Sequence, residues 1–91
     1  MIPTAATPEA QRRIANRLKR AQGQLTAVIA EVERGGECRD VVTQLAAVSK
    51  ALDRAGFAIV ASAMEHCVSD DDEQGRDERL LELERLFLSL S

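Results

Sequence analysis

The stretch CRDVVTQLAAVSKALDRAGFAIVASAMEHCV, residues 38–68, decides the fold of this chain because its apolar side chains return every three or four positions. From residue 41 to residue 59 the spacings are 4, 3, 4, 3 and 4, through Val41, Leu45, Val48, Leu52, Ala55 and Ile59. This spacing is typical of a helix that packs along its whole length against other helices. Further alanines and Val42 widen the apolar face, which predicts burial on more than one side.

The residues before this stretch repeat the same pattern and predict a first helix from about residue 8 to about residue 34. Thr7 is the expected N-cap, and Pro8 stands at the first helical position. Gly35 and Gly36 end the helix, since glycine adopts the left-handed conformation without a steric penalty. The apolar seam of this helix consists of Ile14, Leu18, Ala21, Leu25, Val28 and Val32.

A polar linker, SDDDEQG (69–75), follows the long helix, and its aspartates can cap the next element. A short third helix is expected from about residue 76 to about residue 90. Its apolar face consists of Leu80, Leu83, Phe87 and Leu90. The sequence therefore predicts a single all-α domain over residues 1–91, with three helices and a flexible N-terminus at residues 1–7.

A chain of 91 residues with only two aromatics must build its core from small aliphatic side chains. Two long helices with continuous apolar seams and one short helix do not close a good core alone. We therefore expect a homodimer in which two antiparallel hairpins form a four-helix bundle.

Composition also limits the location and the class of function. No apolar run approaches the roughly 20 residues that span a bilayer, and no signal peptide is recognisable, so a cytoplasmic protein without a membrane partner is expected. In that reducing compartment, two cysteines are more often ligands, nucleophiles or sensors than a structural disulfide. The sequence has no phosphate-binding glycine loop, no nucleophile elbow and no Ser-His-Asp set, which argues against an enzyme.

The two cysteines, Cys38 and Cys67, stand 29 residues apart at opposite ends of one predicted helix. At 1.5 Å per residue they lie about 43 Å apart, whereas a disulfide needs Cα atoms within about 7 Å. In an antiparallel dimer, each Cys38 can instead meet Cys67 of the partner subunit. The alternative is that both are small buried hydrophobes. His66 is expected at the surface, because neighbouring residues on a helix do not face one another.

Basic charge is concentrated early in the chain. Residues 1–36 hold six Lys/Arg against three acids, whereas residues 69–91 hold three against eight. Most of the excess lies in RRIANRLKR (12–20). Such a patch can bind phosphates even on a protein of net charge −3, although a solvated helix face is the alternative interpretation.

The sequence resembles the CsoR/RcnR family of small helical bacterial repressors through NRLKRAQGQL (16–25), ECRDVVTQLAAV (37–48), ALDRA (51–55) and EHCV (65–68). The resemblance implies hairpin dimers that assemble into a disc-shaped homotetramer. It also implies binding to double-stranded operator DNA without a helix-turn-helix, and release when the cysteine site is occupied. The family's important arginines match Arg17 and Arg54, and four further residues would extend the basic surface: Arg13, Lys19, Arg20 and Lys50.

The branches of the family differ at the cysteine site. Copper sensors have a histidine four residues before the second cysteine, where this chain has Ala63. The further histidines of nickel and cobalt sensors are absent, and the N-terminal proline of formaldehyde sensors is displaced, since Pro3 follows Ile2.

Two cysteines without that histidine resemble the CstR-type branch, which senses low-molecular-weight persulfides and polysulfides. The resemblance implies that Cys38 reacts and that Cys67 of the partner subunit resolves it into a di-, tri- or tetrasulfide bridge, with no cofactor. Two alternatives stay open. One is a Cu(I)-sensing repressor that uses Cys38 and Cys67 as ligands. The other is a helical bundle that mediates protein association or carries sulfur.

Overall fold

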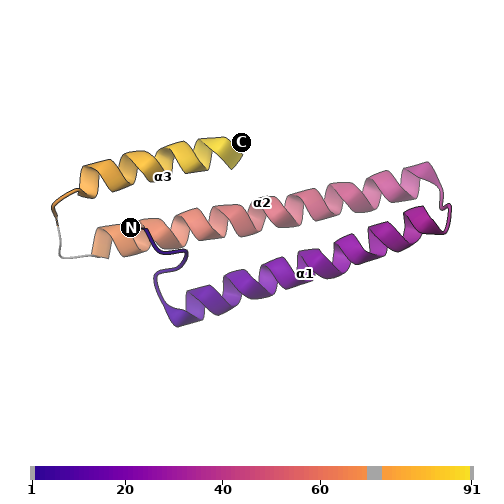
Figure 1. Ribbon diagram of the computed structural model, residues 1–91, viewed down its shortest axis with the longest axis horizontal. Helices are drawn as coiled ribbons and strands as arrows, with labels where there is room; N and C mark the ends of the chain where they lie inside the picture. Colours follow the sequence, from indigo (N-terminus) through magenta and orange to yellow (C-terminus); the bar gives the residue numbers. More distant parts are fainter. Residues whose placement is uncertain (1, 70–72, 91) are drawn as a thin grey trace.

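Three helices make up the computed structural model, which describes residues 2–69 and 73–90 (Figure 1). They are α1 (Pro8–Glu33), α2 (Cys38–Ser69) and α3 (Arg76–Leu90), and the described residues contain no strand. The predicted all-α class with three helices is confirmed. The aspartates expected to cap α3 include residues 70–72, which lie outside the described part of the chain.

Both ends of α1 are closed by local hydrogen bonds. At its start the Thr7 hydroxyl accepts a hydrogen bond of 3.0 Å from the Ala10 N–H. At its end Gly35 adopts a φ of 75° and donates to the carbonyl of Val32, while Gly36 donates to the carbonyl of Glu31. These two bonds form a Schellman motif. The chain reverses there, and α2 begins at Cys38.

The helices form a flat, elongated molecule with Cα extents of 55 × 25 × 14 Å. Helices α1 and α2 lie antiparallel as a long hairpin, and α3 folds back along the C-terminal half of α2 (Figure 1). Contacts join α1 to α2 and α2 to α3, with none between α1 and α3. Among the described residues, no helix is long and apolar enough to span a bilayer.

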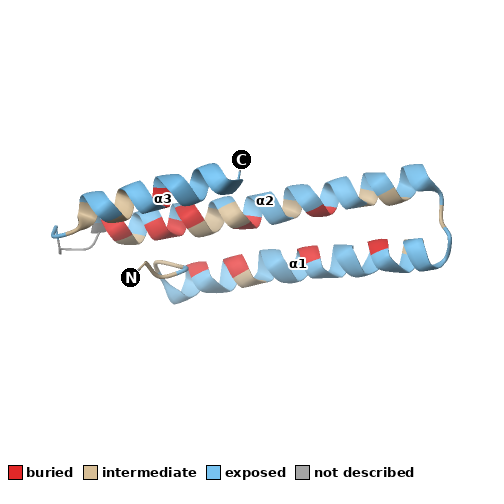
Figure 2. Cartoon of the chain, turned by 45° about the horizontal axis from the view of Figure 1, so that its top comes forward, coloured by how far each residue is buried: buried red, intermediate tan, exposed pale blue. Residues whose placement is uncertain are grey.

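Only half of each apolar seam is covered within the chain. On α1 the residues Ile14, Ala21 and Val28 are buried, whereas the alternate positions Leu18, Leu25 and Val32 are exposed. On α2, Val48 and Ala55 are buried, whereas Leu45 and Leu52 remain about half exposed. Figure 2 shows the same division, with buried segments confined to the facing sides of the helices. Within one chain, therefore, half of the apolar side chains of each seam are covered by the other helix, and the alternate ones remain exposed to solvent.

A small core forms where α3 lies on α2. Its buried members are Ala63, Cys67 and Leu83, and Ile2 and Leu80 pack against them. The N-terminal segment is held over α2 by a 2.7 Å hydrogen bond from the Ala6 N–H to the Ser62 hydroxyl.

The C-terminal end of α3 closes against the middle of α2. The rings of Phe57 and Phe87 contact each other in a tilted arrangement, with centroids 5.3 Å apart and an angle of 39° between the ring planes. A Cβ on Gly56 would come within 2.9 Å of the Leu90 side chain, so glycine permits this close approach.

Candidate functional site

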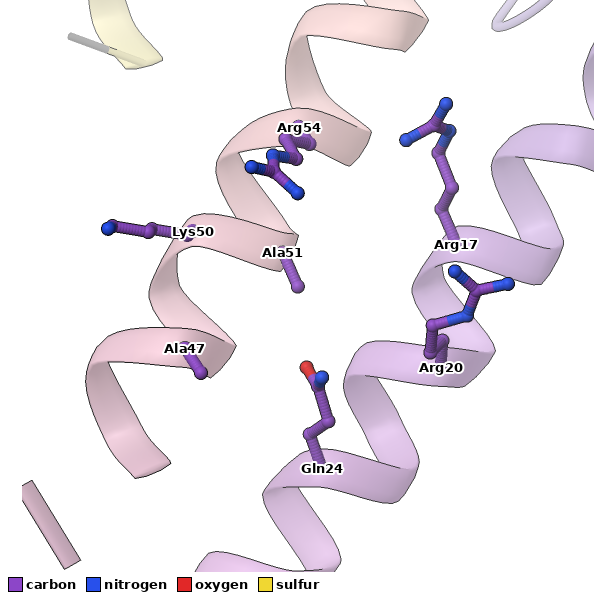
Figure 3. A pocket seen from close by; sticks show the side chains of 7 residues that line it. All are labelled: Arg17, Arg20, Gln24, Ala47, Lys50, Ala51 and Arg54. Carbon is purple, nitrogen blue, oxygen red and sulfur yellow. The ribbon is translucent and has the colours of Figure 1, made fainter. Parts of the chain in front are cut away.

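A basic cleft lies between α1 and α2 and has a volume of about 310 Å³. Figure 3 shows its lining side chains, of which Gln24, Ala47 and Ala51 point into the space between the helices while Lys50 extends outward from the rim. The complete lining is Arg17, Arg20, Gln24, Ala47, Lys50, Ala51 and Arg54.

The spacing along each helix explains why these residues meet. Arg17, Arg20 and Gln24 follow one another at three and four residues, so they share one face of α1. Ala47, Ala51 and Arg54 do the same on α2. The alanine side chains are too short to fill the space between the helices, and this leaves a cavity beneath the longer cationic side chains.

Charge in the basic cleft is of one sign. Four of the seven lining residues are cations, and none is an acid. Arg34 forms an ion pair with Glu31 at the far end of α1, and within the described residues no ion pair involves these four cations. Mutual repulsion between unpaired cations favours the binding of an anion here.

Of the six basic residues expected to contact DNA, the structure gathers Arg17, Arg20, Lys50 and Arg54 around the basic cleft. Arg13 is exposed and precedes Arg17 by four residues, so it extends the same face of α1. Lys19 is exposed but does not line the cleft. Gln24 was not identified as a site residue, although its four-residue spacing from Arg20 could have revealed it.

The two thiols differ in exposure. Cys38 is exposed at the first residue of α2, whereas Cys67 is buried, with 2% of its surface accessible. Both are free thiols, and they lie near opposite ends of α2. Since 29 residues correspond to about eight helical turns, the two cysteines project from the same side of that helix.

Cys67 lies beneath a cover formed by Leu80 and Leu83 of α3 and by Ile2. Ala63 packs beside it in the same core. His66 was expected at the surface and is half-buried. The described residues contain no group of three or more His, Cys, Asp or Glu that could hold a metal ion. Within one chain, Cys67 is therefore packed as a small hydrophobe.

Truncation of this cover should both destabilise the chain and expose the thiol. Leu83→Ala removes a side chain that is 2% exposed, and we expect a loss of about 2–5 kcal/mol in the free energy of unfolding. Iodoacetamide should then alkylate Cys67 faster, as measured by peptide mass spectrometry, with urea unfolding as the stability assay. Leu88→Ala is the matched control because Leu88 is 60% exposed on the same helix. Equal alkylation of Cys67 in both variants would contradict the burial.

Comparison with known proteins identifies the family to which this chain belongs. Residues 10–89 match the family described as metal-sensitive transcriptional repressors. The chain belongs to this family. The resemblance to CsoR/RcnR repressors is thus confirmed at the level of the family, and the protein is a transcriptional regulator rather than an enzyme. Membership of a repressor family implies binding to operator DNA.

Relatives of known sequence support the same assignment. The chain is 47% identical over 57 residues to the uncharacterized protein YrkD of Bacillus subtilis (strain 168), covering 63% of this chain and 90% of that protein. It is 32% identical over 68 residues to the copper-sensing transcriptional repressor CsoR of the same organism, covering 75% and 67%. A copper-sensing repressor CsoR of Mycobacterium ulcerans (strain Agy99) is 36% identical over 67 residues, or 74% of this chain and 57% of that protein.

Proposed function

We propose that this protein is a dimeric, thiol-switched repressor of the CstR type, which senses persulfides through Cys38 of one chain and Cys67 of the partner subunit. In the reduced state it binds operator DNA through the basic cleft. Modification of the thiol pair lowers its affinity for the operator. The observation that carries this proposal is the position of two thiols on one side of α2 at opposite ends, with a non-coordinating Ala63 beside the second.

Dimerisation is supported by the exposed stripes that we call the leucine face: Leu18, Leu25, Val32, Leu45 and Leu52. On α1, Leu18 and Leu25 lie four residues after the buried Ile14 and Ala21, whereas Arg17 and Gln24 lie three residues after them. On α2, Leu52 lies four residues and Ala51 three residues after the buried Val48, and Leu45 and Gln44 stand in the same relation to the partly buried Val41. At about 100° per residue, these offsets fall on opposite sides of the seam. A partner hairpin packed on the leucine face therefore leaves the basic cleft open.

An antiparallel partner also explains the placement of the thiols. A two-fold axis near the middle of α2 brings the start of one helix beside the end of the other, so each dimer contains two Cys38–Cys67 sites. Because Leu83 and Ile2 cover Cys67, this sulfur reaches Cys38 of the partner subunit only when the cover opens. Two such dimers assemble into the disc-shaped tetramer.

The chemistry is thiol exchange, with the persulfide as the oxidant. The Cys38 thiolate attacks the outer sulfur of a persulfide, RSSH, and forms a Cys38 persulfide while RS⁻ leaves and is protonated. The thiolate of Cys67 of the partner subunit then attacks the Cys38 Sγ atom, and HS⁻ leaves. The net reaction converts two thiols and RSSH into one disulfide, RSH and H₂S.

A covalent link between the ends of two hairpins restricts how they slide past one another. The two basic clefts of a dimer must match the spacing of phosphates on one duplex, so a shift between the hairpins lowers affinity. Coupling of this kind between two sites is typically 1–3 kcal/mol, or about 5- to 150-fold in affinity.

Copper sensing is the second candidate, because two of the relatives above are named copper-sensing repressors. Two cysteine thiolates at one site can hold Cu(I) in a linear arrangement. Ala63 offers no third ligand beside Cys67, and this favours sulfur chemistry over a trigonal copper site.

The product of the reaction provides the direct test. After reduced protein is treated with a polysulfide, a non-reducing gel should show a covalent dimer that a thiol reductant reverses. Intact mass should show a disulfide, and a bridge of three or four sulfurs where Cys38 has taken up a longer chain from the polysulfide and Cys67 attacks a sulfur beyond Sγ, with HS⁻ leaving. The control is the same protein loaded with Cu(I) and titrated with a Cu(I) chelator. Absence of the covalent dimer, together with release of promoter DNA by copper alone, would contradict persulfide sensing and support a Cu(I)-sensing repressor.

A further inference from the structure

A second cavity adjoins the basic cleft along the hairpin. This cavity, which we call the amide pocket, has a volume of about 200 Å³ and is lined by Gln24, Ala27, Gln44 and Ala47. Gln24 and Ala47 line both spaces, so the two adjoin along the groove between α1 and α2. One end of the groove carries cations, and the other carries two side-chain amides above alanine.

The side-chain amide of Gln44 has an unpaired acceptor in this groove. Its Oε1 atom is buried and accepts no hydrogen bond from the described residues. A buried acceptor without a donor costs about 1–3 kcal/mol, and native proteins rarely leave one unpaired. An N–H donor from a molecule bound in the amide pocket would satisfy it.

We propose that this groove is a binding site for a free nucleoside polyphosphate, with the phosphates at Arg17, Arg20 and Arg54 and the nucleobase in the amide pocket. One arginine guanidinium group can donate two parallel hydrogen bonds to two oxygens of a phosphate, and glutamine side chains form hydrogen bonds with the edges of bases. The cleft volume of about 310 Å³ lies within the usual range for small-molecule sites.

The distances along the helix fit such a ligand. Arg54 lies ten residues after Gln44 on α2, which places the two about 15 Å apart along the axis. A nucleoside with a phosphate chain extends over such a span, whereas an inorganic phosphate reaches only the cationic end. The groove lies on the opposite side of the buried seam from the leucine face, so the proposed dimer leaves it open.

Duplex DNA cannot contact both the cations and the amide pocket of the groove. Its backbone phosphates can reach the arginines at the rim, but its bases are stacked and paired, and extruding one costs a few kcal/mol. The inference rests on the proposed function only in that both ligands use Arg17 and Arg54. A nucleotide in the groove would therefore compete with operator DNA.

Isothermal titration of the reduced protein with ATP, inorganic triphosphate and adenosine tests the site at low ionic strength. We expect ATP to bind more tightly than triphosphate and adenosine to bind weakly. Gln44→Leu should weaken ATP binding about tenfold and leave triphosphate binding unchanged, while Arg20→Ala should weaken both about tenfold. Arg12→Ala and Gln22→Ala are matched controls, because both residues are exposed on α1 and line neither space.

Two results would overturn the inference. One is the absence of binding by any of the three ligands, with circular dichroism showing a folded protein. The other is equal affinity for ATP and triphosphate with no effect of Gln44→Leu, which would leave a simple anion site. A parallel titration with a promoter duplex separates the two proposals. Binding of ATP without the duplex would refute only the proposed function, and binding of the duplex without ATP would refute only this inference.

Discussion

Mixed dimers of Cys38→Ala and Cys67→Ala chains should recover a polysulfide cross-link that neither variant forms alone. In a mixed dimer, one chain supplies Cys38 and the other supplies Cys67, so one of the two sites is complete. Random exchange of subunits makes about half of the dimers mixed. A non-reducing gel after polysulfide treatment should therefore show no covalent dimer for either variant and a strong band for the exchanged mixture.

The same experiment separates a site between chains from chemistry within one chain. Mixing the two variants without prior subunit exchange is the control, because unexchanged dimers contain no complete site. Cross-linking of Cys67→Ala alone, through two Cys38 residues, would contradict the antiparallel arrangement. Failure of the exchanged mixture to cross-link, with wild-type protein cross-linking normally, would contradict it as well.

Replacement of either Arg17 or Arg54 should nearly abolish operator binding. Arg17→Ala and Arg54→Ala each remove one cation from the basic cleft, and a dimer loses two. A charge-assisted hydrogen bond contributes about 1.5–3 kcal/mol, so two lost contacts predict about 100-fold weaker binding or more. The slope of log K against log salt should become shallower by about 2, at about 0.9 per phosphate contact. Fluorescence anisotropy with a promoter duplex at several salt concentrations measures both.

The matched control for this prediction is Arg12→Ala, which removes an exposed cation from α1 outside the cleft. We expect it to change affinity less than threefold, about the effect of a remote surface charge. Lys19→Ala should have a smaller effect than Arg17→Ala, because Lys19 does not line the cleft. Equal losses in all variants would show that net charge, and not the geometry of the cleft, determines binding.

The three helices could be predicted because their signals are local. Apolar spacing identified α1 and α2, and Thr7, Pro8 and the glycines 35 and 36 marked where the hairpin begins and turns. The same pattern could not show that the seam divides in two, with Ala21 buried and Leu25 exposed, since that depends on which side α2 covers. A heptad pattern specifies that a helix packs, but not against which neighbour.

The candidate site was predictable in part. The resemblance selected Arg17, and the basic charge around it added Arg13 and Lys19. Of these three only Arg17 lines the cleft, because spacing on both helices determines which cations converge. The burial of Cys67 depends on how α3 and Ile2 dock, contacts between residues far apart in sequence. Gln44 was overlooked within an apolar run, yet it lies three residues before Ala47 and seven before Ala51, on the side of α2 that faces the groove.

The most direct test of the central claim is the affinity of the protein for the promoter duplex next to its own gene, measured by anisotropy before and after polysulfide treatment. We predict tight binding by the reduced protein, a loss of about 5- to 150-fold on treatment, and recovery on reduction. The Cys67→Ala protein should bind the duplex and not respond. Unchanged affinity of a fully cross-linked wild-type protein would contradict the account.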